Sequence, residues 1–136
     1  MNKRIYIVED EIIVSMEIQD RLMRLGYLVS GTAVSGEEAL EEIPNSRSDL
    51  VLMDIRLSGS LGGIETVELL KEFVNIPVVF ITAYSDKRTI DRMIAVDPAG
   101  YILKPISDLE LLTAIESALS NPFEYEHLNE VLYYRV

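Results

Sequence analysis

Short apolar runs alternate five times with segments whose apolar residues recur at helical spacing, and this alternation limits the possible folds. The apolar runs predict strands at 3–8, 50–54, 78–82 and 100–103, and residues 28–33 predict a second, weaker strand. Strands joined by helical crossovers pair in parallel, and helices then cover both faces of the sheet. The runs at 50–54 and 78–82 are typical of central strands that are buried on both faces. The sequence therefore predicts a doubly wound α/β fold.

Two capping boxes mark helix starts, because in each a serine precedes a glutamate by three residues. They are Ser35 with Glu38 and Ser107 with Glu110. We expect the first helix to stop near Pro44 and the second at about residue 120.

The spacing of apolar residues also predicts which helix faces point inward. These faces comprise Val14, Ile18, Leu22 and Leu25 in residues 11–25, Ile64, Val67, Leu70 and Val74 after a glycine-rich loop, and Leu112, Ile115 and Leu119 in the last helix. Residues 86–96 form a polar helix, in which Ile90, Met93 and Ile94 are candidate surface contacts although some of them must be core.

Charged or hydroxyl residues stand where four of the apolar runs end. They are Glu9-Asp10, Asp54, Thr82 and Lys104. In an open α/β sheet the ligand lies at the carboxyl edge of the strands, where these residues would gather. Clustered carboxylates require a hard cation, whereas a lysine and a hydroxyl suit a phosphoryl group. The pattern predicts magnesium-dependent phosphoryl chemistry on Asp54.

Length and composition exclude several classes of protein. The 136 residues suffice for one domain but not for two ordinary ones. A net charge of −11, with no Lys/Arg cluster, argues against binding nucleic acids or anionic membranes. The absence of cysteine excludes disulfides, zinc–thiolate sites and thiol nucleophiles. No run reaches the length of a signal peptide or a membrane span, so we expect a cytoplasmic protein.

The carboxylate of Asp54 can attack phosphorus and form an aspartyl phosphate, one of the covalent intermediates open to carboxylates. Glu9, Asp10 and Asp54 can supply the few carboxylates that a magnesium ion needs. Lys104 and Thr82 can then neutralise or hydrogen-bond the phosphoryl oxygens.

The order Glu9-Asp10, Asp54, Thr82, Lys104-Pro105 resembles the receiver domain of two-component response regulators, over roughly residues 3–120. The resemblance implies a flavodoxin-like (βα)5 fold with a five-stranded parallel sheet in the order 2-1-3-4-5. We therefore assign residues 1–120 to a receiver domain. Residues 121–136 are a C-terminal tail or the start of a linker, with helical spacing of Tyr125, Leu128 and Leu132.

The resemblance also implies roles for individual residues. Asp54 would be the phosphoacceptor, taking a phosphoryl group from a histidine kinase or a phosphotransfer protein. Magnesium would be held by Glu9, Asp10, Asp54 and the backbone carbonyl of Arg56. Thr82 and Tyr101 would be the switch residues, Lys104 would pair with the phosphate, and the Lys104–Pro105 bond would be cis.

By this interpretation the protein is a switch and not a turnover enzyme, although it promotes its own phosphorylation and dephosphorylation. Phosphorylation would shift the face formed by residues 86–119, and a partner or a second copy of the chain would recognise that face.

Three positions depart from the family pattern. Ser58 stands where a proline is common, the loop that follows is one residue longer than usual, and Gly62 replaces a frequent aspartate. Tyr84, two residues after Thr82, occupies a position that tunes hydrolysis of the acyl phosphate. We expect its bulk to shield the phosphate from water.

Other functions fit the sequence less well. A phosphatase of the haloacid-dehalogenase type needs an acid two residues after its nucleophile, where Arg56 stands. An FMN-binding flavodoxin needs small residues in its first loop, where Glu9 and Asp10 would repel phosphate. A receiver-like module that signals without phosphorylation needs neither Lys104 nor Thr82, and magnesium binding would separate it from the phosphorylated switch.

Overall fold

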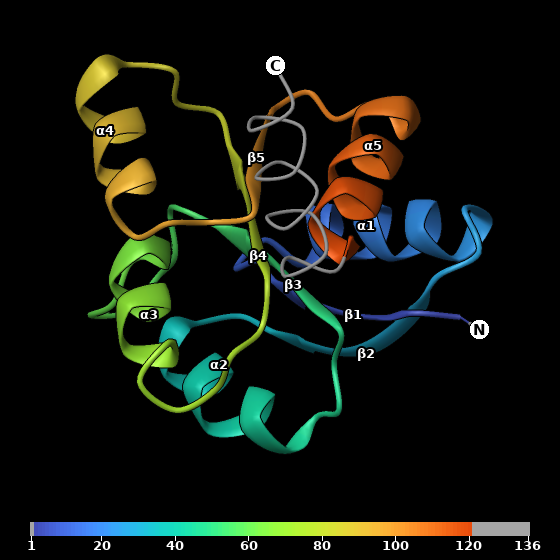
Figure 1. Ribbon diagram of the computed structural model, residues 1–136, viewed down its shortest axis with the longest axis horizontal. Coiled ribbons are helices and arrows are strands. Elements are labelled where there is room, and N and C mark those ends of the chain that lie inside the picture. Colours follow the sequence, from blue (N-terminus) through green and yellow to red (C-terminus); the bar gives the residue numbers. More distant parts are fainter. Residues whose placement is uncertain (1, 121–136) are drawn as a thin grey trace, which may run out of the picture.

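The computed structural model describes residues 2–120. Within that range, strands and helices alternate along the chain (Figure 1). The strands are β1 (Arg4–Val8), β2 (Leu28–Ala33), β3 (Leu50–Asp54), β4 (Val78–Thr82) and β5 (Gly100–Leu103). The helices are α1 (Ile12–Arg24), α2 (Gly36–Glu42), α3 (Gly63–Leu70), α4 (Lys87–Ala95) and α5 (Asp108–Leu119), with a short 3₁₀ helix at Ile43–Asn45.

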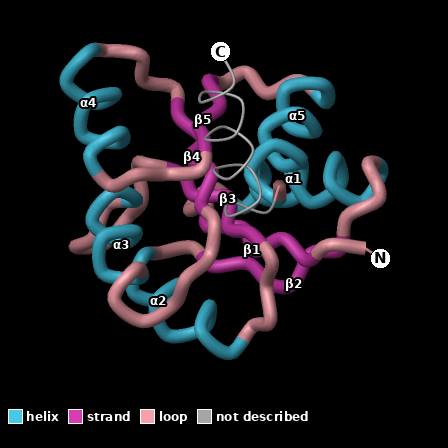
Figure 2. The backbone as a smooth tube through the Cα atoms, in the orientation of Figure 1, coloured by secondary structure: helices cyan, strands magenta, loops and turns pink. Residues whose placement is uncertain are grey.

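All pairings in the sheet are parallel, and the strand order is β2-β1-β3-β4-β5. This confirms the predicted doubly wound fold. Every residue of β3 and β4 is buried, as the continuous apolar runs indicated. Figure 2 shows the sheet in the middle of the molecule, with α1 and α5 on one face and α2, α3 and α4 on the other.

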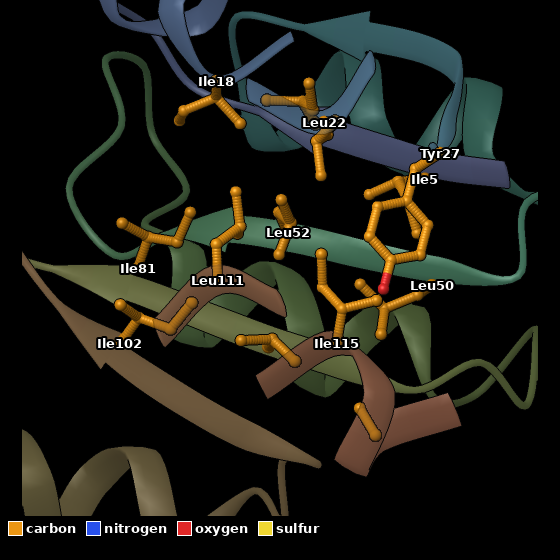
Figure 3. Close-up of a cluster of buried hydrophobic side chains, with 13 residues drawn as sticks. Ile5, Ile18, Leu22, Tyr27, Leu50, Leu52, Ile81, Ile102, Leu111 and Ile115 are labelled. Carbon is orange, nitrogen blue, oxygen red and sulfur yellow. The ribbon is translucent and has the colours of Figure 1, made fainter. Parts of the chain in front are cut away.

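Each face of the sheet has its own apolar core. In Figure 3, side chains of α1 and α5 such as Leu22 and Ile115 point toward Leu50 and Leu52 of β3. The opposite face packs residues such as Val67 of α3 against the other side of the strands. Apolar packing on both faces holds the strands in place. Polar side chains can then gather at the carboxyl ends of the strands.

The structure refines the predictions about two helix faces. The buried residues of α5 are Leu111, Ile115 and Ala118, so Leu112 and Leu119 lie beside the inward face and are only partly buried. In α4, Met93 is fully buried and Ile94 is exposed, so Met93 belongs to the core, as some of the three candidate contacts had to, and Ile94 remains a candidate surface contact.

None of the helices formed by residues 2–120 combines the length and the hydrophobicity needed to cross a bilayer. The predicted role of residues 121–136 lies outside the described residues.

Candidate functional site

The parallel pairing of β1 with β3 brings three carboxylates together at the carboxyl edge of the sheet. Val8 lies opposite Met53, so Glu9 and Asp54 occupy the adjoining positions. Oxygen atoms of Glu9, Asp10 and Asp54 all lie within 4.8 Å of one another. Glu9 and Asp54 are buried, whereas Asp10 is partly exposed.

Lys104 reaches the same cluster from the end of β5. Its Nζ lies 3.3 Å from Oε1 of Glu9 and 3.7 Å from Oδ2 of Asp54. The backbone helps to fix it, because the Lys104 amide donates to the carbonyl oxygen of Thr82 over 2.8 Å. The peptide bond that follows, Lys104–Pro105, is cis.

Burial and charge shift the protonation of this cluster. Burial, with the nearby Asp54 carboxylate adding to its effect, raises the pKa of Glu9 to about 7. The Glu11 amide and Lys104 act in the opposite direction, and the amide donates to Oε2 of Glu9 over 3.2 Å. Burial lowers the pKa of Lys104, but Asp54 and Glu9 outweigh it and the net direction is upward, so the ammonium stays charged.

The donor set fits a magnesium ion. Carboxylate oxygens are the ligands that this hard cation takes, and it keeps several waters, which the partly exposed Asp10 allows. Opposite ligands of magnesium, at bond lengths of about 2.1 Å, lie roughly 4.2 Å apart. Oxygen atoms that all lie within 4.8 Å of one another are thus close enough to share one ion after at most a small adjustment.

The two predicted switch residues lie on β4 and β5. Thr82 is fully buried, and its Oγ1 accepts a hydrogen bond of 2.9 Å from the Tyr84 amide. Tyr101 stands opposite Phe80 in the β4–β5 register and is 43% exposed. The structure thus places Thr82 inside the sheet edge and Tyr101 on the surface.

Arg56, beyond the end of β3, lies against Tyr84, beyond the end of β4. The guanidinium carbon of Arg56 is 5.1 Å from the centre of the Tyr84 ring, a cation–π contact. Together with Glu65, Thr89 and Arg92 they line a cavity of about 260 Å³. Sequence reasoning missed this contact, because the two residues are far apart in sequence and only the strand order brings them together.

The site and the sheet define a class of protein. It is a doubly wound domain in which three carboxylates and a lysine meet at the carboxyl edge of the sheet. The sequence profile of the response regulator receiver domain matches residues 5–116. The chain belongs to this family, whose members are phosphorylation-controlled signalling switches that work with histidine kinases and output domains.

Individual relatives agree with this assignment. The transcriptional regulatory protein PdtaR of Mycobacterium tuberculosis is 32% identical over 118 residues, which cover 87% of this chain and 57% of that protein. The chemotaxis protein CheY of Thermotoga maritima is 28% identical over 116 residues, which cover 85% of this chain and 96% of CheY. The chain therefore spans nearly all of CheY but little more than half of PdtaR.

A solved structure also resembles this one closely. The signal receiver domain of a modulated diguanylate cyclase from Desulfovibrio desulfuricans has a TM-score of 0.82 and 38% identity. The match covers 88% of this chain and 94% of that domain.

Proposed function

We propose that Asp54 is the phosphoacceptor of a two-component phosphorelay and takes its phosphoryl group from a phosphohistidine donor. A carboxylate oxygen of Asp54 attacks phosphorus, the P–N bond to the donor histidine breaks, and the imidazole leaves with the bonding electron pair. The observation that supports this most strongly is the position of Lys104 Nζ beside both Asp54 and Glu9. A single cation there can neutralise an incoming phosphoryl oxygen.

Glu9, Asp10, Asp54 and the backbone carbonyl of Arg56 are the proposed magnesium ligands. The bound ion would neutralise phosphoryl oxygens as charge develops. Glu9 also holds Lys104 in place, and the buried hydroxyl of Thr82 is the proposed donor to a further phosphoryl oxygen. The same groups favour hydrolysis of the acyl phosphate, so the domain would promote both its phosphorylation and its dephosphorylation.

The proposed output is a change in the face formed by residues 86–119. Movement of Thr82 toward the phosphoryl group breaks its bond to the Tyr84 amide and alters the segment that leads into α4. Tyr101 would then leave its exposed position and fill the vacated space. An output partner or a second copy of the chain would bind the altered face, on which Ile94, Tyr101 and Leu103 are exposed.

Two further parts of the proposal concern the domain boundaries and the cellular location. Residues 1–120 would form the receiver domain, and residues 121–136 would connect it to another segment or act as a tail. A phosphohistidine donor is charged from cytosolic ATP, so the proposed setting is the cytoplasm.

The test is phosphorylation by acetyl phosphate and by phosphoramidate, a small donor with a P–N bond, with and without magnesium. Intact-mass spectrometry should detect one phosphoryl group on the wild type with magnesium, and none on Asp54→Asn. Asp20→Asn, a change at an exposed aspartate of α1, is the matched control and should be phosphorylated normally.

The outcome against the proposal is equally clear. A folded wild-type protein that neither binds magnesium nor accepts phosphate from either donor would leave the receiver-like interaction module as the better description. If Asp54→Asn still gains a phosphoryl group, the acceptor is another residue.

A further inference from the structure

The loop between β3 and α3 contains Arg56, whose carbonyl is a proposed magnesium ligand, yet the loop has no regular structure. Its ends are held locally. The Arg56 amide lies 3.4 Å from Oδ1 of Asp54, and the Gly63 amide donates to the Ile55 carbonyl over 2.7 Å. The middle, residues 57–61, must be held by something else if the position of Arg56 is to be fixed.

Within residues 2–120, the hydrogen bonds made by this middle segment all run to one side chain, that of Glu37. Oε1 of Glu37 accepts from the Ser60 hydroxyl over 2.7 Å and from the Leu61 amide over 3.1 Å. The Ser60 hydroxyl, with help from the amides of the loop, lowers the pKa of Glu37, so the carboxylate is ionised near neutral pH.

The side chain of Glu37 can bind the loop because other residues already cap the start of α2. The Ser35 side chain accepts from the Glu38 amide, and the Glu38 side chain lies 3.4 Å from the Val34 amide. This is the capping box read from the sequence, and Glu37 takes no part in it. Its carboxylate nevertheless lies at the positive end of the helix, which favours the charge.

Close packing reinforces the contact between α2 and the loop. Gly59 has φ of +103°, and a Cβ built on it would lie 3.0 Å from Oε2 of Glu37. A Cβ on Gly36, the first residue of α2, would clash with Thr66 of α3 and lie 3.1 Å from Cβ of Leu61. Helices α2 and α3 pack against each other (Figure 1), and these close approaches join the loop to both of them.

We propose that Glu37 is a positioning residue for the magnesium site: it anchors residues 57–61 and thereby fixes the Arg56 carbonyl. This rests on the proposed function. The anchor takes the place of the proline and the aspartate that receivers often have in this loop, where this chain has Ser58 and Gly62. A longer loop with two glycines has more conformational entropy to lose, and a hydrogen-bonded anchor offsets that loss in advance of metal binding.

The experiment compares the full chain with Glu37→Ala, Glu37→Gln, Ser60→Ala and the matched control Glu41→Ala, an exposed glutamate of the same helix. In magnesium-free protein, hydrogen exchange at the Leu61 amide should become at least about fivefold faster in Glu37→Ala. By calorimetry, its magnesium affinity should fall about three- to tenfold, less than the roughly 10–100-fold typical of partners that touch a metal ligand directly.

The other variants separate anchoring from charge. Glu37→Gln keeps an oxygen acceptor and should stay within about twofold of the wild type, whereas a pure charge effect would make it resemble Glu37→Ala. In the double variant, Ser60→Ala should add nothing to Glu37→Ala, since the partner of the Ser60 hydroxyl is already gone.

The proposal is overturned if Glu37→Ala binds magnesium as the wild type does, or if Glu41→Ala loses the same affinity. A wild-type chain that binds no magnesium would instead remove the proposed function on which the inference rests. The exchange rate of Leu61 in the metal-free protein then shows whether the anchor itself exists.

Discussion

Helices α3 and α4 lie side by side on one face of the sheet and have 8 and 9 residues, but they are anchored very differently (Figure 1). The buried residues of α3 are Gly63, Ile64, Thr66, Val67 and Leu70, whereas Met93 is the one buried residue of α4. A fully buried large apolar side chain contributes about 1.5–3 kcal/mol. Ile64, Val67 and Leu70 are three such side chains on α3, whereas α4 has one. Displacing α4 therefore requires much less free energy than displacing α3.

The polar contacts of α4 run to α3 and not to the sheet. Arg92 forms an ion pair of 2.5 Å with Glu65, and Lys71 Nζ donates to the carbonyl oxygens of Val96 and Asp97 just after α4. A firmly packed helix thus acts as a support for a loosely packed one. Since α4 follows Thr82 by only a few residues, a change at the proposed phosphorylation site would act on the helix that has fewer buried side chains.

The largest expected effect is the loss of an anchor of α3. Leu70→Ala removes a buried side chain and leaves a cavity, so the free energy of unfolding should fall by about 3 kcal/mol. Ile94→Ala, on the exposed side of α4, should change it by less than about 0.5 kcal/mol. Urea denaturation at constant m-value measures both. Equal losses would mean that α4 is packed as firmly as α3, and the comparison would fail.

Met93→Ala should have a smaller global effect than Leu70→Ala, about 1–2 kcal/mol, although both side chains are fully buried. The reason is that α4 can detach while the rest of the domain stays folded, which limits the loss to the attachment energy of that helix. Hydrogen exchange should accordingly accelerate at amides of α4 and stay unchanged in α3. Uniform acceleration across both helices would show instead that they unfold as one unit.

The strands and the convergence of the site could be predicted from the sequence, whereas the inward face of a helix could be predicted only in part. The bounds of β2 to β5 agree with the predicted ranges, and for β3 and β4 the reason is that continuous apolar runs have sharp ends. The convergence of Glu9, Asp54 and Lys104 follows from the parallel sheet, in which all strands end at one edge. Periodicity failed where apolar residues are adjacent, as at Leu111 and Leu112, because neighbouring phases of the helix then fit equally well.

Contacts that loops make with distant segments could not be predicted from the sequence. The Arg56–Tyr84 stack and the Glu37–Ser60 bond each join segments that no local pattern connects. Both depend on the order in which strands and helices pack, which the spacing of residues along the chain leaves undetermined.

Tyr84 links the connection that enters α4 to the loop that enters α3, through its stack on Arg56. If the ring shields the acyl phosphate, Tyr84→Ala should shorten the phosphate lifetime about three- to tenfold, a change of roughly 1 kcal/mol in the barrier. The lifetime is measured by mass spectrometry, as the decay of the phosphorylated protein after the phosphoryl donor is removed. Tyr84→Phe keeps the ring and is the control. A lifetime that does not change in Tyr84→Ala would reject shielding.

The smallest effect concerns the ion pair between Glu65 and Arg92, whose side chains are 42% and 51% exposed. Exposed pairs of this kind contribute about 0–1 kcal/mol, so a double-mutant cycle with Glu65→Ala and Arg92→Ala should give a coupling near 0.5 kcal/mol that salt reduces. The pair Lys87–Asp91 lies within α4 and serves as the control, because breaking it leaves the contact with α3 intact. If α4 depends on α3 for its position, breaking Glu65–Arg92 should accelerate exchange in α4 more than breaking Lys87–Asp91 does. Equal acceleration would mean that the ion pair does not position α4, and that burial of Met93 and the Lys71 hydrogen bonds after the helix suffice to hold it.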